Sequence, residues 1–359
     1  MTALRIAWKD IKFLLRSKTM LVFTILMPVL MMLMMGYIFP KDYNGKIEGK
    51  IGIYSQDPAF NIMMMLSKGK EHVKLFKNRE ELIDALAKNE VIAAAVVPKG
   101  FMKSLSKGNA EIEVIPNPSN PQAGIMMSHL ITSMISSATN KKDVKKIKAN
   151  LTGVYGGEFN YYDFMAPGMM AMIAIMSVST GLAASITRER ELGTLDGLMV
   201  APINRSSIII GKILAQTVRG ITQALIVLVV AVVLFGVRIH GNILSTLLLL
   251  FLTTFSFIGI GIIITAGIKE QETAQIVMST VTFPMMFFSG VFFPIDQMPK
   301  FAQYISYIFP LTYAADALRK NITLGVGLSY MTFDIEMLIL FSIVSSIAAT
   351  LLFPKLVKD

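Results

Sequence analysis

The stretch RERELGTLDGLMVAPINR, residues 188–205, is a short charged island between two long apolar runs. If the segment is helical, one stripe carries its apolar side chains, Leu192, Leu195, Leu198 and Met199. The opposite side carries Gly193 and Gly197, where another backbone can approach closely because glycine has no Cβ. Pro202 cannot continue a helix and disfavours helical geometry at Ala201. The pattern predicts a short docking helix within residues 187–206, and a solvated loop whose charges set the orientation of the chain is the alternative.

The composition of the whole chain is that of a membrane protein. Of its 359 residues, 53% are hydrophobic and only 16% are charged, whereas a soluble domain has about 25% charged residues. The net charge of +10 lies largely beside the apolar runs, where it suits orientation and anionic lipid. No stretch has the basic and aromatic pattern of a nucleic-acid module. We therefore expect membrane lipid, and no nucleic acid, as a partner.

Six apolar runs are long enough to cross a hydrocarbon core of about 30 Å. They cover residues 20–39, 162–186, 208–235, 243–268, 274–293 and 331–353. Because their number is even, both termini lie on one side, and the basic flanks of the runs identify that side as cytoplasmic. The sequence therefore predicts an α-helical polytopic protein of the cell membrane, with six transmembrane helices and a short cytoplasmic tail at 354–359.

Residues 1–19 precede the first run and have an amphipathic pattern. Leu4 and Trp8 begin an apolar helical row, and Arg5 and Lys9 begin an adjoining basic row. A helix of this kind lies in the membrane interface, with the tryptophan at the depth of the headgroups. We expect an N-terminal interfacial helix here.

Residues 40–160 are polar and rich in lysine, and they contain no spanning run. Strand patterns alternate with helical patterns, with strands at 50–54, 72–76, 91–97 and 111–115 and helices at 61–67, 79–89 and 101–106. A further long helix is expected from Pro121 towards Asn150. This alternation predicts an inserted α/β domain with a core of its own, on the extracellular side.

Residues 294–330 are too polar and too interrupted by proline to cross the membrane. Their aromatic side chains Phe301, Tyr304 and Tyr307 suit the depth of the outer interface. We expect an extracellular hairpin of short helices in the outer leaflet or at its surface. An aromatic belt and an external gate are the two roles open to it.

The sequence carries no catalytic motif. The four Gly-Lys pairs lack both the earlier glycine and the following Ser or Thr of a phosphate-binding loop, so any ATP must be hydrolysed by another chain. Cysteine is absent, and His72, His129 and His240 are isolated, so no metal site is predicted. Lys212 and Arg219, near the cytoplasmic end of the third run, are expected to snorkel to the membrane surface.

Three stretches resemble the permeases of ATP-binding-cassette type 2 exporters. The first comprises Glu191, Gly193, Thr194, Leu195, Leu198 and Pro202, followed by Gly211 and Lys212. The second, residues 85–124, is similar to the branch of the family with a large external domain after the first span. The third comprises residues 283–294, 298–299 and 307–319, and it is similar to the end of the fifth span and the external hairpin.

The resemblance implies a permease subunit that exports a hydrophobic or amphipathic solute, such as a drug, a lipid or a peptide-like molecule, by alternating access. Two permease subunits, identical or different, would pair with separate ATPase subunits that bind ATP and Mg²⁺. This chain would bind no cofactor and would not itself be an enzyme. The charged island resembles the coupling helix that contacts the ATPase, and its implied coupling residues are Glu189, Glu191, Gly193, Thr194, Gly197 and Pro202.

In this family the second and fifth spans line the dimer interface and the substrate path. The implied lining residues are Ser177, Thr180, Met285, Phe287 and Phe288. Interhelical hydrogen bonding is the alternative role of each hydroxyl. Three other functions stay open: a sodium-extruding permease of the same family, an ATP-independent carrier, and a receptor whose external domain binds a ligand. The lack of carboxylates at depth in the runs argues against the carrier.

Overall fold

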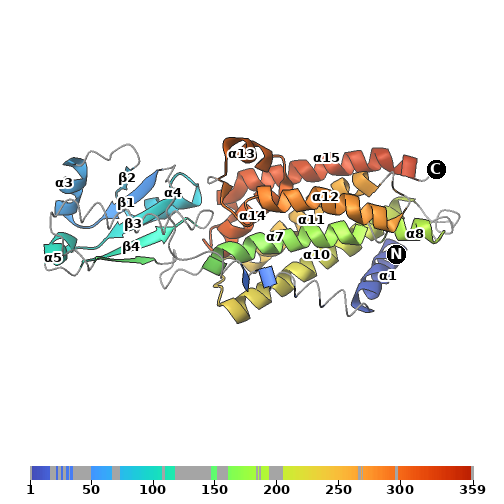
Figure 1. The fold of residues 1–359 in the computed structure, drawn as a ribbon, viewed down its shortest axis with the longest axis horizontal. Helices are drawn as coiled ribbons and strands as arrows, with labels where there is room; N and C mark the ends of the chain where they lie inside the picture. The colour runs from blue at the N-terminus through green and yellow to red at the C-terminus, as the bar shows by residue number, and fades with distance from the viewer. Residues whose placement is uncertain are drawn as a thin grey trace. The chain divides into compact units, whose positions relative to one another are not determined.

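In the computed structural model of the chain, the described residues are 2–16, 22, 26, 30–31, 33–34, 50–66, 73–106, 110–117, 147–151, 161–182, 185, 187–193, 205–265, 268, 270–295 and 298–356. The chain divides into two compact units (Figure 1). One is a helical unit, Met1–Met34 and Met165–Asp359, and the other is an α/β unit, Met35–Phe164.

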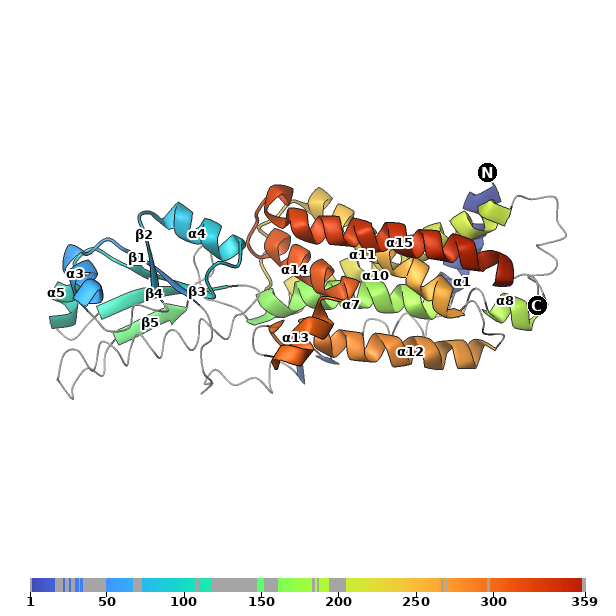
Figure 2. The same cartoon turned by 90° about the horizontal axis from the view of Figure 1, so that it is seen from above.

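The helical unit contains long helices that run side by side, together with several shorter ones (Figures 1 and 2). Its elements are α1 (Thr2–Arg16), α7 (Tyr161–Leu182), α8 (Arg188–Glu191), α10 (Arg205–Phe235), α11 (Ile243–Thr265), α12 (Gln271–Phe288), α13 (Lys300–Ser306), α14 (Pro310–Ile322), the 3₁₀ turn Leu328–Met331 and α15 (Thr332–Leu356).

Four helices among the described residues are long and apolar enough to cross a membrane, namely Tyr162–Leu182, Ile210–Phe235, Ile243–Ile264 and Leu328–Ile347. They coincide with four of the six predicted runs. The run at 20–39 lies mostly outside the described residues, and α12 is 18 residues long with a polar first turn. The helical, membrane-type character of the chain is thus confirmed, and a total of six spans stays a prediction.

The fifth run differs from its predicted bounds of 274–293. The helix begins earlier, at Gln271, and ends at Phe288. Gly290 has a φ of 75°, a left-handed conformation that glycine adopts without steric cost and that ends helices. The residues after Ser289 therefore form a turn.

Packing in the helical unit is close. Every side chain of α7 from Met165 to Ile175 is buried, while α11 packs along α15 and α1 packs along α10. On α1, Ile6 and Ala7 are buried, whereas Leu4 and Trp8 are exposed, as an interfacial helix requires. The outward faces of α10 and α15 are apolar, so they suit a lipid environment.

The segment predicted as a hairpin at the surface is partly internal. The aromatic side chains Phe301, Tyr304 and Tyr307 are exposed, as expected, but α14 is almost wholly buried. Burial of α14 is possible because the polar side chains at its end hydrogen-bond to neighbouring helices, which offsets the cost of removing them from water. The segment thus contributes α14 to the interior of the helical unit, and its expected place in the outer leaflet or at the surface of that leaflet stays a prediction.

The α/β unit contains a five-stranded sheet in the order β2-β1-β3-β4-β5. The strands are β1 (Ile51–Ser55), β2 (Val73–Phe76), β3 (Ala93–Val97), β4 (Ala110–Pro116) and β5 (Ile147–Leu151). Neighbouring strands are parallel except for β3 and β4, which are antiparallel. The four predicted strands are present as β1 to β4. Strand β5 stands where the end of a long helix was expected, and residues 121–146 of that predicted helix lie outside the described part.

Helices cover both faces of this sheet. Ile51 and Ile53 of β1 share a core cluster with Phe60 of α3 (Pro58–Leu66) and Phe101 of α5 (Phe101–Ser106). Because side chains alternate along a strand, Gly52 faces the other side, where a Cβ would overlap Leu82 of α4 (Arg79–Ala87). The unit therefore has a core on each face of the sheet.

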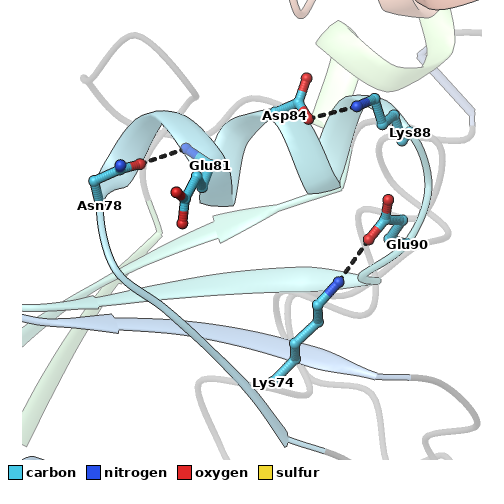
Figure 3. A network of polar contacts seen from close by, with 6 residues as sticks. All are labelled: Lys74, Asn78, Glu81, Asp84, Lys88 and Glu90. Carbon is cyan, nitrogen blue, oxygen red and sulfur yellow. Dashed lines mark hydrogen bonds and ion pairs between the residues drawn. The ribbon is translucent and has the colours of Figure 1, made fainter.

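Exposed polar contacts are found along α4 and between β2 and the residues that follow α4 (Figure 3). Asn78 caps the helix by accepting the backbone N–H of Glu81 at 2.7 Å, and Lys88 pairs with Asp84 at 2.7 Å. Lys74 of β2 pairs with Glu90 beyond the helix at 2.6 Å. Such exposed ion pairs stabilise a fold by about 0–1 kcal/mol each, so we regard this network as structural.

Candidate functional site

The carboxylate of Glu189 is the point where three segments of the helical unit meet. Glu189 lies in α8 and is 9% exposed. One of its oxygens accepts a hydrogen bond from Lys9 of α1, and the other is 2.8 Å from Nζ of Lys212 in α10. Lys212 also donates to the backbone carbonyl of Ser185 at 2.6 Å, between α7 and α8. The predicted coupling residue Glu189 thus connects α1, α8 and α10.

The electrostatics of this cluster keep Glu189 ionised. Burial acts to raise the pKa of Glu189, but the nearby Lys212 and Lys9 ammonium groups outweigh burial, so the pKa is lowered from its ordinary value. The expectation that Lys212 snorkels to the membrane surface is wrong, because its side chain is buried and paired inside the unit. Removing one partner of a buried ion pair leaves the other charge buried without a counter-ion, which lowers the free energy of unfolding by about 3–5 kcal/mol.

The end of α8 is a turn rather than a longer helix. The last helical hydrogen bond runs from the N–H of Leu192 to the carbonyl of Arg188, and Gly193 follows with a φ of 67°. The continuous helix expected up to Ala201 is therefore wrong at this point, because a left-handed residue interrupts a helix. Gly193 does present an open side, since no atom lies within 4 Å of the position that a Cβ would take.

Two of the other predicted coupling residues can be placed, and three cannot. Glu191 and Gly193 are exposed at the end of α8. Thr194, Gly197 and Pro202 lie outside the described residues. An exposed turn next to a buried ionic cluster is an arrangement through which a bound partner could displace several helices together.

A stripe of polar side chains continues from this cluster along α10. Its members, spaced at four, three and four residues, are Lys212, Gln216, Arg219 and Gln223, and all are buried. This spacing places them on one face of the helix. That face meets α7, because Arg219 donates to the hydroxyl of Thr180 at 3.4 Å and a Cβ at Gly181 would overlap the side-chain oxygen of Gln216.

Several buried polar atoms along this stripe have no hydrogen-bond partner among the described residues. They are Oγ of Ser177, Oε1 of Gln216, Oγ1 of Thr217 and Nε2 of Gln223. Buried polar groups are normally paired, and ordered water is a common partner of such groups. The single sequence signal for the stripe is the period of its four polar residues within an apolar run.

The predicted substrate-path residues occupy different environments. Ser177 is buried, and Thr180 is half-buried and bonds the carbonyl of Met176 at 3.0 Å. On α12, Met285 is buried, Phe288 is half-buried and Phe287 is exposed. Their role as a lining stays a prediction. A contact that does join α7 to α12 is made by the hydroxyls of Ser179 and Thr282, 3.4 Å apart, and it is the interhelical hydrogen bonding expected of hydroxyls in these two apolar runs.

The α/β unit has one position where a ligand is commonly found in related sheets. In open sheets with parallel strands, ligands bind beyond the carboxyl ends of the strands where the order of the strands reverses. Here the carboxylate of Asp57, which follows β1, accepts the backbone N–H of Ala59 in α3 and that of Met102 in α5, each at 2.9 Å. The carboxylate of Asp57 therefore occupies two N–H groups that a bound anion would otherwise use. This edge of the sheet gives no support to the alternative that the α/β unit is a ligand-binding receptor domain.

Known transporter proteins are similar in sequence to this chain. The profile described as ABC-2 family transporter protein matches residues 18–351. The probable multidrug ABC transporter permease YbhS of Escherichia coli K12 is 23% identical over 334 residues, which cover 88% of this chain and 87% of that protein. The probable multidrug ABC transporter permease YbhR of the same strain is 24% identical over 255 residues, 69% of each chain.

A eukaryotic relative is longer. ABC transporter G family member 20 of Dictyostelium discoideum is 26% identical over 259 residues, which are 71% of this chain and 35% of that protein. The chain thus spans about a third of the length of this relative. Because the family profile covers nearly the whole sequence, this chain belongs to the ABC-2 family of transporter proteins.

Proposed function

We propose that this chain is the membrane-spanning permease subunit of an ATP-driven exporter that moves a hydrophobic or amphipathic solute out of the cell. Family membership and the names of the two bacterial relatives, both probable multidrug permeases, support a drug, lipid or peptide-like solute. A separate ATPase subunit would bind ATP and Mg²⁺, and a second permease subunit would complete the path. The observation that carries the proposal is the ionic cluster of Glu189 beside the exposed turn at Gly193.

The cluster suggests how a movement of the ATPase would reach the membrane. A subunit that contacts the turn at Gly193 pushes on α8, and Glu189 transfers that push to α1 through Lys9 and to α10 through Lys212. The contact between the polar stripe of α10 and α7 can then rearrange, because several of its polar atoms have no hydrogen-bond partner among the described residues. ATP can shift the permease between two states only if the ATPase binds one of them more tightly.

The proposed topology follows from the six apolar runs. Both termini and the turn at Gly193 lie in the cytoplasm, and the α/β unit lies outside the cell, as the basic flanks of the runs favour. The solute path runs between α7 and α12, which the Ser179–Thr282 contact brings together.

The docking of an ATPase at Gly193 can be tested by purification in mild detergent, with ATP hydrolysis measured in the eluate. Gly193→Trp places an indole on the open side of the turn and strains a residue with positive φ. We expect it to lower the co-purified ATPase activity about tenfold, equivalent to ~1.4 kcal/mol of binding.

The matched control is Gly236→Trp. Gly236 has the same φ of 67° and the same open space, but it follows the C-terminal end of α10, far along that helix from Lys212. This variant should retain the ATPase. Equal retention in both variants would contradict docking at Gly193, and the absence of an ATPase from the unmodified protein would contradict the proposed function as a whole.

A further inference from the structure

Three consecutive polar residues at the end of α14 reach three different parts of the helical unit. Arg319, Lys320 and Asn321 are all buried, with exposures of 4%, 8% and 1%. Buried polar groups of this kind are retained where they bond to specific partners. The partners of these three residues show which helices are held together at this end of the unit.

Two of the three residues hold α14 to α15 and α11. Nζ of Lys320 is 2.8 Å from a carboxylate oxygen of Asp334 in α15 and 2.8 Å from one of Asp316 in α14. The side-chain amide of Asn321 donates to the hydroxyl of Thr246 in α11 at 2.7 Å. Because α11 also packs along α15, the three helices α11, α14 and α15 form one block.

Arg319 points to a different place, the joint between α7 and the end of α12. Its guanidinium donates to the carbonyl oxygens of Gly290 at 2.6 Å and Val291 at 3.3 Å, in the turn that follows α12. A Cβ on Gly168 of α7 would lie 2.7 Å from this guanidinium and 3.5 Å from Cα of Val291. The backbone of α7, the turn and Arg319 are therefore in direct contact.

We propose that Arg319 is a positioning residue of an outer gate, which we define as Gly168, the turn at Gly290 and Val291, and Arg319. In the closed state the guanidinium holds the turn against α7, and solute leaves when Arg319 releases the two carbonyls and α7 separates from the turn. The inference rests on the proposed function, in which the path runs between α7 and α12. Gly168 lies 11 residues from Ser179, about 16 Å along α7 from the second contact between these helices.

The hydrogen bonds from Arg319 to Gly290 and Val291 end on neutral carbonyl oxygens, which water can replace once the joint opens. The turn can move because it is a short non-helical segment at the end of a helix, where hinges are commonly found.

The test measures thiol reactivity in the complete complex with its ATPase, placed in lipid nanodiscs. The chain contains no cysteine, so Val291→Cys introduces the single thiol of the permease at a fully buried position. We expect ATP turnover to accelerate its modification by a water-soluble maleimide about tenfold. Ala317→Cys is the control, because Ala317 is equally buried in α14 and lies two residues from Arg319, on the far side of the helix. Its reactivity should not depend on ATP.

A second comparison needs no ATP. In the Val291→Cys background, Arg319→Gln should raise the rate of modification about tenfold, whereas Asn321→Ala, which removes contacts to α11 instead, should not. If Arg319 only supported the fold, Arg319→Gln would still raise the rate of modification by loosening the joint. However, the rate of modification of Val291→Cys with Arg319 intact would then not depend on ATP.

The outcomes separate the two proposals. If the complex hydrolyses ATP but the rate of maleimide modification of Val291→Cys does not change, the gate is overturned and the proposed function stands. A complex that hydrolyses no ATP overturns the proposed function, and the Arg319→Gln comparison then decides whether Arg319 seals the joint. An unchanged rate in Arg319→Gln overturns the gate in either case.

Discussion

The carboxylate of Asp57 shows how a single residue positions two helices of the α/β unit. Each of its oxygens accepts a backbone N–H from a different helix, α3 or α5. The N-terminal N–H groups of helices have no partner within the helix, so one carboxylate satisfies a donor of each. The packing of Phe60 against Phe101, with ring centroids 5.5 Å apart, completes the joint.

We predict that Asp57→Asn destabilises this part of the unit by about 1–2 kcal/mol, since an amide offers one acceptor oxygen in place of two. Faster amide hydrogen exchange in peptides covering residues 51–66 and 97–106 of the full chain would show it. Asp84→Asn is the control, because Asp84 makes an exposed pair with Lys88 worth at most about 0.5 kcal/mol. Equal effects of the two substitutions would contradict the special role of Asp57.

The same carboxylate predicts a pH dependence. Hydrogen bonding to the N–H of Met102, the largest effect, lowers the pKa of Asp57 below its ordinary value of 3.8 and outweighs burial, which acts to raise it. A depressed folded pKa means that the stabilisation is complete above the unfolded pKa and is lost as the pH falls through the folded one. Protection of these peptides should therefore decline only below about pH 4, and Asp57→Asn should abolish that decline.

At the scale of elements, the close contact between α11 and α15 depends on a glycine. A Cβ on Gly259 of α11 would overlap the backbone of Ser345 in α15. Small residues let the backbones of membrane helices approach in this way, and the gain is van der Waals packing. The block that holds the proposed gate depends on this contact.

We predict that Gly259→Ala costs about 1–3 kcal/mol, because the added methyl group must push two backbones apart. Thermal unfolding of the detergent-solubilised protein would show a lower midpoint. Gly327→Ala serves for comparison, since the nearest atom to a Cβ there is Oγ of Ser329 at 3.9 Å. A midpoint unchanged by Gly259→Ala would mean that α11 and α15 are not packed as described.

At the scale of the whole molecule, the two units differ in what they expose. The outward faces of α10 and α15 carry apolar side chains such as Val233 and Val344, which are 72% and 57% exposed. The surface of the α/β unit instead carries ion pairs, among them those of Lys74 and Lys88. One unit is thus suited to lipid and the other to water.

The proposed topology predicts a difference in labelling from outside intact cells. Ser104 in the α/β unit and Leu192 beside Gly193 are both exposed, so a cysteine at either position should be reactive where reagent reaches it. Ser104→Cys should react with a membrane-impermeant maleimide in intact cells, and Leu192→Cys should react only after permeabilisation. Labelling of both variants in intact cells would overturn the assigned orientation.

Much of the fold could be predicted because it depends on local patterns. Apolar runs identify spans from composition and length alone. The four strands predicted in the α/β unit are present in the structure as β1 to β4. Strand β5 was missed because its sequence, IKANL, alternates apolar and polar residues over only five positions and directly follows a lysine-rich segment that was interpreted as a long helix. It is a strand because β4 offers it a parallel partner, and that information is not local.

The sequence by itself determined that this is a helical membrane protein of the ABC-2 family, because hydropathy and motifs are properties of contiguous residues. Only the tertiary structure decided which polar groups meet. Lys212 was expected at the membrane surface, yet it is buried against Glu189, which also binds Lys9 from the far end of the sequence. The reason is physical: the free energy of a buried charge depends on its partners in space, and the fold brings these partners together from separate segments of the chain.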